Sequence, residues 1–438
     1  MNTAIKNFTQ KIEVIDKYLL VFIGLIPISL AISIFLAELF GSVAGIILIY
    51  IILKKDTTFL KSLKKEIFLM IIFYTIILIS LILSDFFKNS FLPSFFYFRY
   101  FLVSLSIFYL LNKYEFIIPI FLYIILATIS LVVFDSIYQY LSGNNLLGYP
   151  KPVVNKEMSY LTSFFDQEKK LGSYLVRFLP LILALTYIYN ESKYAYLNKY
   201  ILLAVGMVVI NSSERTALFL YFFTLASYIL VNEHKLKVTF ISFSIILILF
   251  TLNPMLKKKY IDLTLNQMEF VESRHYNTGV IRYISQEHEN LMYTALLIFK
   301  DNIMFGSGIK TFHPVCKKLQ KEYLRDRIGE NEKRNKLVCS THPHSTYFQL
   351  LSDIGIFGFL IFFYFFCYII TTFYKILFKV EKKDPYLISY FFINIGMTIA
   401  IFPLIPSGNI FNNWICLMSY CTLGFWFFIK KKVIYKNL

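Results

Sequence analysis

Long apolar runs separated by short polar connections dominate this chain. Many of them approach the roughly 20 residues that an α-helix needs to cross the hydrocarbon core of a bilayer. Two of the runs, 41–53 and 200–212, are short for a full crossing, so we expect those helices to be tilted, broken or extended into the interface. We predict an all-α polytopic membrane protein with about twelve membrane-spanning helices, at approximately 18–38, 41–53, 67–84, 98–111, 116–135, 173–190, 200–212, 216–231, 238–252, 347–374, 386–405 and 411–429.

One long polar segment, residues 253–346, interrupts the apolar runs. We expect it to form a single large loop within one membrane domain that spans residues 1–438. Inside the loop, residues 293–302 have helical apolar spacing and predict a helix along the membrane surface. Gly306-Ser307-Gly308 follows and predicts a turn, because a lone Gly-x-Gly is weak support for a phosphate-binding loop.

The composition agrees with a membrane protein: 57% of the residues are hydrophobic, 19% are aromatic, and the mean hydropathy is +0.60. The net charge of +17 raises the question of nucleic-acid binding. However, the cations are not packed on one amphipathic element, and many lie in short connections between the predicted spans. We therefore expect no nucleic-acid partner. The first apolar run is long enough to span and a second follows at once, which argues against a cleavable signal peptide.

The lysines in the short connections predict the orientation. The connections 38–41 and 406–413, on the opposite side, contain no Lys or Arg. By the positive-inside rule both termini are cytoplasmic, and 135–172, 211–215 and the long loop lie on the outer face of the membrane. The lysines that set this orientation, all on one side if there are twelve spans, are Lys6, Lys11, Lys17, Lys54, Lys55, Lys61, Lys64, Lys65, Lys375, Lys379, Lys382, Lys383, Lys430, Lys431 and Lys432.

Two histidines, His342 and His344, flank Pro343 directly before a predicted span. Proline lacks an amide donor and disfavours helix in the residue before it, so we expect the helix to begin at or after Pro343, with Ser345 or Thr346 as its cap. His344 then lies where a helix meets water, beside unpaired N–H groups. Because imidazole moves protons near neutral pH, His344 is a candidate general base. The alternative is an interfacial polar residue without a chemical role.

Arginines form the second group of candidates. Arg177 lies inside an apolar run, where a charge usually faces a partner or ligand, although it could also snorkel to the interface. Arg215 opens another run and could instead be an anchor paired with Glu214. Arg274 and Arg282 belong to the long loop, where the alternative is solvated charge. Guanidinium groups bind phosphate oxygens two at a time, so arginines beside a histidine suit a pyrophosphate leaving group.

The cysteines separate into two sets. Cys367, Cys416 and Cys421 lie in apolar runs and are expected to be inert. Cys316 and Cys339 share the long loop, where an oxidising compartment would allow a disulfide worth roughly 3 kcal/mol; free thiols are the alternative. No Cys or carboxylate has a recognised ligand spacing with the two histidines, so we expect no metal site.

Several of these residues stand at a recognisable spacing. His344-Ser345 is followed by nine residues and then by Gly355-Ile356-Phe357-Gly358. Three further elements accompany this spacing: residues 213–217 (Ser-Glu-Arg-Thr-Ala), residues 299–308, and residues 171–174 with Arg177. Together they resemble the signature elements of the O-antigen ligase and O-antigen polymerase superfamily of bacterial envelope glycan assembly. The chain departs from that pattern in two places: the loop-helix tryptophan is absent, and the loop arginine has no clear counterpart, because Arg282 lies several residues upstream.

This resemblance implies a C-type glycosyltransferase fold in the bacterial inner membrane, with the active face in the periplasm. It implies an inverting, metal-independent transfer of glycan from undecaprenyl pyrophosphate, with no cofactor. The acceptor would be lipid A-core, as in a ligase in lipopolysaccharide biosynthesis, or a growing glycan, as in a polymerase. By motif, His344 would activate the acceptor hydroxyl, and Arg215 with Arg177 would bind the pyrophosphate. His342, Arg274 and Arg282 are further substrate-binding candidates.

Two other classes of protein compete with the enzyme. A lipid-linked oligosaccharide transporter or flippase would need a substrate site near the bilayer midplane. The predicted spans are nearly free of internal charge, and Arg177 lies near one face, which favours chemistry at the surface. A non-catalytic scaffold would give no reason for arginines and histidines to share one side. The sequence leaves the ligase and polymerase alternatives, the sugar and the acceptor open.

Overall fold

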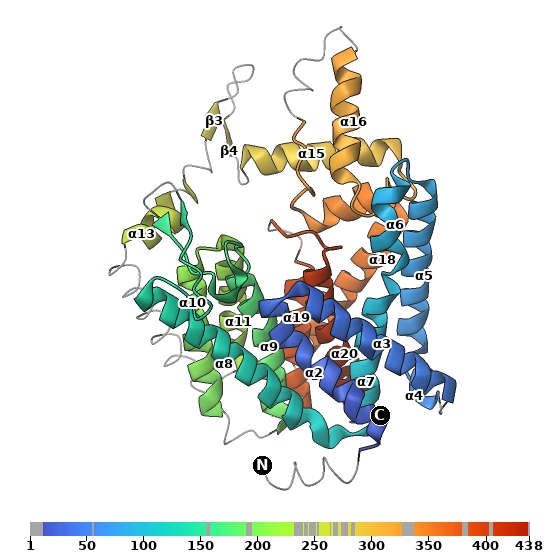
Figure 1. Ribbon diagram of the computed structural model, residues 1–438, viewed down its shortest axis with the longest axis vertical. Helices are drawn as coiled ribbons and strands as arrows, with labels where there is room; N and C mark the ends of the chain where they lie inside the picture. Colours follow the sequence, from blue (N-terminus) through green and yellow to red (C-terminus); the bar gives the residue numbers. More distant parts are fainter. Residues whose placement is uncertain are drawn as a thin grey trace.

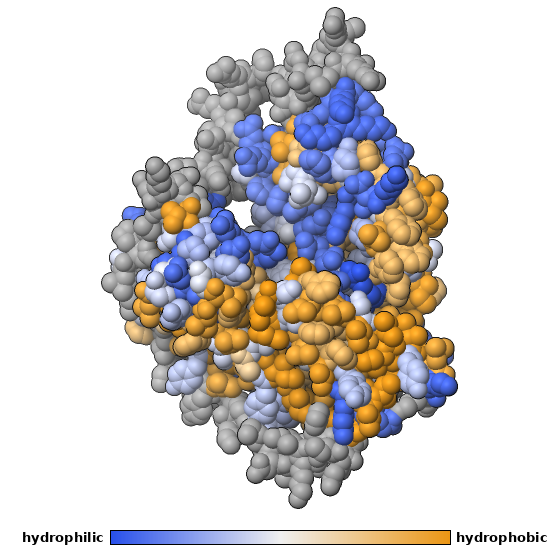
Figure 2. Space-filling view, viewed as in Figure 1, coloured by the Kyte–Doolittle hydropathy of each residue, from blue (hydrophilic) through white to orange (hydrophobic). Residues whose placement is uncertain are grey.

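The computed structural model describes residues 12–54, 57–154, 158–189, 195–231, 240, 244, 251, 254–262, 264–265, 270–272, 279–281, 285–325, 337–378, 384–402 and 406–436. Seven helices in this part of the chain are long and apolar enough to cross a membrane, and shorter apolar helices accompany them. The chain is therefore a multi-pass membrane protein. Figure 2 shows hydrophobic side chains over the lower part of the visible face and hydrophilic ones over α15 and α16 above.

The fold is almost entirely helical (Figure 1). Two antiparallel pairs of short strands join it, β1 (Val153–Val154) with β2 (Met158–Ser159) and β3 (Phe270–Glu272) with β4 (Gly279–Ile281). The helical elements are α2 (Val14–Ile32), α3 (Ile34–Lys54), α4 (Thr58–Lys61), α5 (Lys64–Leu83), α6 (Phe87–Phe95), α7 (Phe98–Lys113), η1 (Glu115–Ile117), α8 (Ile118–Ser142), η2 (Ser163–Phe165), α9 (Leu171–Tyr189), α10 (Ala195–Ser212), α11 (Arg215–Val231), α13 (Pro254–Lys257), η3 (Lys258–Asp262), α15 (Gln286–Asp301), α16 (Phe312–Arg325), α18 (Thr346–Leu377), α19 (Pro385–Ala400) and α20 (Asn413–Lys436).

Most of the predicted spans coincide with a helix. The run at 238–252 lies almost wholly outside the described residues. The surface segment predicted at 293–302 is part of α15, which begins earlier, at Gln286. The predicted spans that are helical are those of α2, α3, α5, α7, α8, α9, α10, α11, α18, α19 and α20.

The predicted break between the first two spans, at 38–41, is wrong. The break is at Ser33, whose extended backbone separates α2 from α3. Hydropathy does not change across Ser33, and no Gly or Pro marks the position, so the pattern placed the break at the first charged residue, Glu38. Inside α3, Glu38 instead forms an ion pair of 2.6 Å with Arg99 of α7.

Helix α9 lies at the centre of the bundle, in contact with α8, α10, α11 and α19. Its buried residues cover every side of the helix after the first turn. Two large side chains of this core place their polar atoms in hydrogen bonds: the Tyr174 hydroxyl donates to the carbonyl of Pro27 at 2.6 Å, and the Trp414 indole N–H donates to the carbonyl of Leu30 at 3.0 Å. Such satisfaction is what allows Tyr and Trp to lie deep in an apolar interior.

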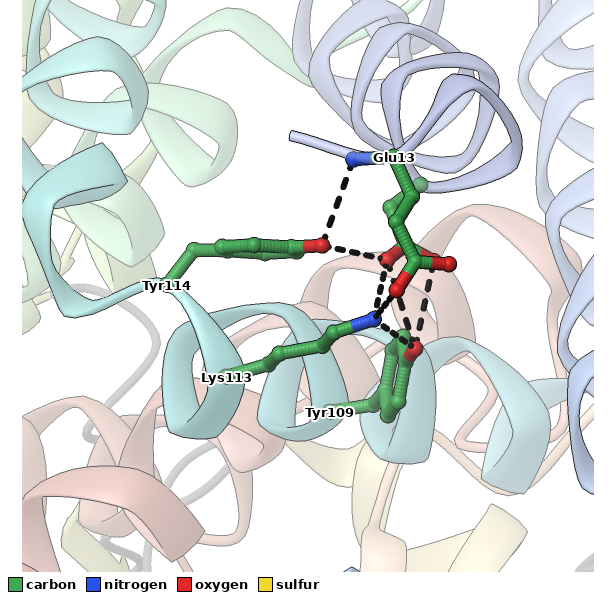
Figure 3. Close-up of polar contacts among 5 residues, drawn as sticks. Glu13, Tyr109, Lys113 and Tyr114 are labelled. Atoms are coloured by element: carbon green, nitrogen blue, oxygen red, sulfur yellow. Dashed lines mark hydrogen bonds and ion pairs between the residues drawn. The ribbon is translucent and has the colours of Figure 1, made fainter. Parts of the chain in front are cut away.

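A buried carboxylate joins α2 to α7 at one end of the bundle (Figure 3). Asp16 is fully buried. Its oxygens accept hydrogen bonds from Lys113 and Tyr114, each at 2.8 Å, and from Tyr109 at 3.2 Å. Lys113 also pairs with Glu13 at 2.8 Å. A buried charge needs such partners, because an unpaired one would be strongly destabilising.

The long loop carries its own small core at the other end of the bundle. Helices α15 and α16 pack through the buried residues Leu291, Ala295, Ile298, Phe312, Leu319 and Leu337. The sequence did not predict α16. A disulfide between Cys316 of α16 and Cys339 joins this unit to the segment that precedes α18, with the two Cα atoms 5.5 Å apart. The loop is therefore tied to the backbone five residues before His344.

Candidate functional site

The backbone at His344 is constrained by its neighbours. Helix α18 begins at Thr346, with Ser345 at the N-cap position as predicted, but the Ser345 side chain makes no capping hydrogen bond. His344 has a φ of 52°, in the left-handed region that non-glycine residues rarely adopt. Its carbonyl accepts a hydrogen bond of 2.9 Å from the amide of Ser407. Backbone strain of this kind clusters at functional sites.

Three imidazoles gather at this point. The ring centroid of His344 is 4.0 Å from that of His342 and 5.6 Å from that of His288, which lies in the first turn of α15. His288 Nδ1 is 2.6 Å from the Ser285 hydroxyl, and His342 Nδ1 is 3.0 Å from the Thr341 hydroxyl. Nothing in the sequence indicates that α15 brings His288 to His344.

All three imidazoles are held in the neutral form. Burial lowers the pKa of His344, and the nearby His288 lowers it further. Burial and the neighbouring His344 lower the pKa of His342 to about 4. Burial also lowers the pKa of His288. A neutral imidazole at pH 7 keeps one ring nitrogen able to accept a proton.

Two glycines allow the loop before α16 to lie against α18. At Gly355 the helix is interrupted by a φ of 68° and a ψ of −166°. A Cβ on Gly355 would lie 2.4 Å from the backbone of Met304, and one on Gly306 would lie 2.4 Å from the carbonyl carbon of Asp353. Only glycine fits such positions, because both the space and the positive φ exclude a side chain.

The Gly306-Ser307-Gly308 segment is a turn, with φ values of 69° and 109° at its glycines. The amide of Ser307 bonds to the carbonyl of Ser352 at 2.8 Å, and that of Gly308 to the carbonyl of Asp353 at 2.9 Å. The turn therefore docks on the interrupted helix. The amides of Ser307 and Gly308 are used in this packing, which holds the turn against α18 next to the interruption at Gly355.

Glu214, in the turn between α10 and α11, precedes Arg215 in the sequence and organises the structure around the candidate arginines. Its buried carboxylate accepts hydrogen bonds from the amides of Gly172 and Ser173, at 2.6 and 3.0 Å, and from the Ser173 hydroxyl at 2.7 Å. It thereby caps the N-terminus of α9. Ser213, with a φ of 62°, makes the turn that points Glu214 toward α9 and starts α11 at Arg215.

Arg177 lies on α9 and interacts electrostatically with Glu214. Its Nε and Nη1 atoms are buried and have no hydrogen-bond partner among the residues that the structure describes. Arginine side chains that snorkel keep the charged group in water, and these two nitrogens are not in water. Buried guanidinium donors without acceptors are costly, so Arg177 is a position of unmet hydrogen bonding.

Lysines add to the positive charge around Arg215. The Arg215 guanidinium donates to the backbone carbonyl of Lys259 at 3.3 Å. The ammonium groups of Lys169 and Lys259 lie 4.7 and 5.7 Å from the centre of the Tyr160 ring. Burial, together with the neighbouring charges of Lys169 and Arg215, lowers the pKa of Lys259 to about 8.

The sequence did not mark Lys169 or Lys259 as site residues. Lys259 ends a run of three lysines that reads as solvated loop charge. The one sequence feature that sets Lys259 apart is the aromatic residue after it, Tyr260. The Tyr260 hydroxyl donates to the carbonyl of Ile210 at 2.9 Å and so holds this segment against α10. We use the name basic cluster for five residues: Arg177, Arg215, Lys169, Lys259 and the carboxylate of Glu214.

The segment between α19 and α20 connects the histidines to the basic cluster. The Thr216 hydroxyl, one residue after Arg215, donates to the carbonyl of Pro406 at 3.2 Å. The next residue, Ser407, bonds through its amide to His344 and through its hydroxyl to Thr346 at 2.9 Å. Two adjacent residues therefore contact both sides of the site.

Arg274 and Arg282 lie outside the described residues. In the described part of the chain, no three or more His, Cys, Asp or Glu side chains are arranged to hold a metal ion. The arrangement instead offers neutral imidazoles beside a basic cluster with more cations than anions. Such a site can accept a proton and hold an anionic group.

A comparison with protein families matches residues 200–363 to the O-antigen ligase family. The matched range includes Arg215, Lys259, His288 and the histidines before α18, as well as Gly355, whereas Arg177 precedes it. A search of the curated proteins finds no match. Residues 200–363 are therefore similar to the O-antigen ligase family, in agreement with the resemblance that the motifs predicted.

Proposed function

We propose that this protein transfers an oligo- or polysaccharide from undecaprenyl pyrophosphate to an acceptor hydroxyl on the periplasmic face of the bacterial inner membrane. The family match supports a glycan ligase or polymerase in general. The donor, the face and the acceptor, lipid A-core or a growing glycan, are part of the proposal. The observation that carries it is Arg177 of the basic cluster: two nitrogens of its guanidinium are buried and have no hydrogen-bond partner among the described residues.

His344 takes the role of general base. Its imidazole is neutral at pH 7, because burial lowers its pKa, and it can accept the proton of the acceptor hydroxyl. The acceptor oxygen then bonds to the anomeric carbon as the bond from that carbon to the pyrophosphate oxygen breaks. Attack opposite to the leaving group inverts the configuration.

The basic cluster takes the role of binding the leaving group. Negative charge grows on the pyrophosphate as the sugar–oxygen bond breaks, and preorganised cations stabilise that charge. Arg177 and Arg215 supply planar forks of donors, and Lys259 supplies a compact charge beside them. We propose that these side chains suffice without a metal, so that transfer by the purified protein is expected to persist in EDTA.

The decisive experiment compares a strain deleted for this gene with the same strain carrying wild type or His344→Asn. Asn tolerates the left-handed backbone at this position but is not a base, so the variant is expected to be made and inserted normally. Lipopolysaccharide gels then separate the alternatives. Bare core with accumulated lipid-linked glycan identifies a ligase, and core bearing a single repeat identifies a polymerase.

Two outcomes would contradict the proposal. An unchanged ladder in the deletion strain would exclude lipid A-core and its glycan as acceptors. Full complementation by His344→Asn would exclude the general base. A flippase is separated by a second assay, because purified protein with lipid-linked glycan and acceptor on the same side of a vesicle would then give no transfer product.

A further inference from the structure

A groove of about 630 Å³ runs along the membrane-spanning part of the bundle, apart from the histidines and the basic cluster. Helices α5, α7, α18, α19 and α20 line it. Its wall is mainly apolar and includes the aromatic residues Phe73, Phe101, Phe362, Phe365 and Trp426. A long apolar surface of this kind accepts hydrocarbon rather than a sugar or a nucleotide.

The groove extends along most of α20. At one end it is lined by Tyr97 and Ile410, beside the segment that contacts His344. At the other end it is lined by Lys61, Lys64, Lys65 and Lys430. On α20, the lining residues Cys416 and Ile434 are 18 positions apart, which is about 27 Å at 1.5 Å per residue. This length approaches the thickness of the hydrocarbon core.

The lysine end has an excess of positive charge. Lys430 pairs with Glu66 at 2.7 Å, and its ammonium group lies 4.7 Å from the ring centres of both Tyr368 and Trp426. The other three lysines are exposed and have no acidic partner among the residues that the structure describes. The groove therefore combines an apolar wall with a basic mouth.

We propose that this groove binds an anionic phospholipid from the adjacent leaflet. Its acyl chains lie along the aromatic wall, and its phosphate lies among Lys61, Lys64 and Lys65. Basic pockets between membrane helices have the right chemistry for anionic headgroups. A polyprenyl donor fits less well, because the basic mouth lies at the end of the helices opposite to the basic cluster around Arg215.

The test uses purified, delipidated full-length protein and native mass spectrometry with added phosphatidylglycerol, phosphatidylcholine or undecaprenyl phosphate. We expect phosphatidylglycerol to be retained most strongly. The triple variant K61Q/K64Q/K65Q should weaken its retention about a hundredfold, since each lysine near a headgroup contributes roughly a factor of five. The matched control K17Q/K54Q/K375Q removes the same charge from residues that do not line the groove and should have little effect.

A second variant tests the wall. Ser419 lines the groove, and Ser419→Trp would fill part of it, so that all lipid retention at this site should fall even with the lysines intact. Equal losses in the two lysine triples would overturn the proposal, as would equal retention of phosphatidylcholine. Preferential retention of undecaprenyl phosphate would assign the groove to the donor instead. Circular dichroism and gel filtration establish that each variant is folded.

Discussion

The carbonyl of His344 accepts a hydrogen bond from the amide of Ser407, at 2.9 Å. This contact joins two segments that are 63 positions apart in the sequence. It also holds His344 in its left-handed conformation, because the carbonyl of the strained residue is fixed from outside the local chain. The position of the proposed base therefore depends on the connection between α19 and α20.

Removing the Ser407 amide should impair transfer more than folding. Ser407→Pro deletes the donor, and a hydrogen bond of this type contributes about 1 kcal/mol, so we expect a fall in kcat of about fivefold. Ser407→Ala is the control, because it keeps the amide and loses only the hydroxyl contact to Thr346. Equal rates for the two variants would show that the amide does not position His344.

We expect Arg177 to lower the thermal stability of the protein while it contributes to donor binding. Arg177→Met removes a buried guanidinium with unmet donors, so we expect the melting temperature to stay unchanged or rise. The same variant should lower kcat/KM for the lipid-linked donor by about a hundredfold, because a charged hydrogen bond contributes roughly 1.5–3 kcal/mol. Arg177→Lys should recover only part of this loss. A variant that loses stability and keeps full activity would exclude the binding role.

The pH profile of transfer should be bell-shaped. Activity should fall at low pH as His344 becomes protonated, with the acid limb below pH 6.5 because burial lowers the pKa of this residue. Activity should fall again near pH 8 as Lys259 loses its proton and its charge. Lys259→Arg keeps the charge at all these pH values and should shift the basic limb upward. A basic limb that does not move would remove Lys259 from the mechanism.

The two glycines with positive φ at 143 and 355 provide a matched pair. Gly143 ends α8 with a φ of 89°, and a Cβ there would meet nothing within 4 Å. Gly143→Ala should therefore cost only the conformational penalty, about 1 kcal/mol of unfolding free energy. Gly355→Ala adds a collision with the backbone of Met304, so we expect a larger loss of thermal stability together with a loss of transfer. Equal melting temperatures would contradict the docking of the 306–308 turn on α18.

The disulfide should matter for the order of the segment before α18. Cys316→Ser with Cys339→Ser opens a loop with a sequence separation of 23 residues, and we expect a loss of roughly 3 kcal/mol within the α15–α16 unit. Limited proteolysis of the purified protein measures this local loosening. Cys367→Ser, which changes an exposed free thiol, is the control. Identical cleavage patterns for all variants would show that the apolar contacts of the unit suffice.

The sequence predicted the helices well where one signal decides the structure. A run of apolar residues in a membrane has no alternative to a helix, because every backbone group must find its partner inside the segment. The break at Ser33 was missed because no change in hydropathy marks it. The interruption at Gly355 was hidden for the same reason inside one continuous apolar run.

Only the site residues that belong to sequence motifs could be predicted. His344 and Arg215 stand in recognisable spacings, whereas the approach of His288 depends on how α15 packs against α18. Lys259 was missed because its environment is made by distant residues: its partners belong to the α10–α11 turn and to the segment before α9. Burial and long-range contacts, which change the pKa of a residue, are absent from the linear pattern.

The Asp16 contacts have a consequence for how the chain enters the membrane. Asp16 belongs to α2, but its partner Lys113 is 97 residues further along. During synthesis α3, α4, α5 and α6 are made before α7, so the Asp16 carboxylate exists before its counterion, and burying it unpaired would be strongly destabilising. We therefore expect α2 to complete its packing only after α7 emerges, which makes biogenesis of this protein a concerted rather than a helix-by-helix process.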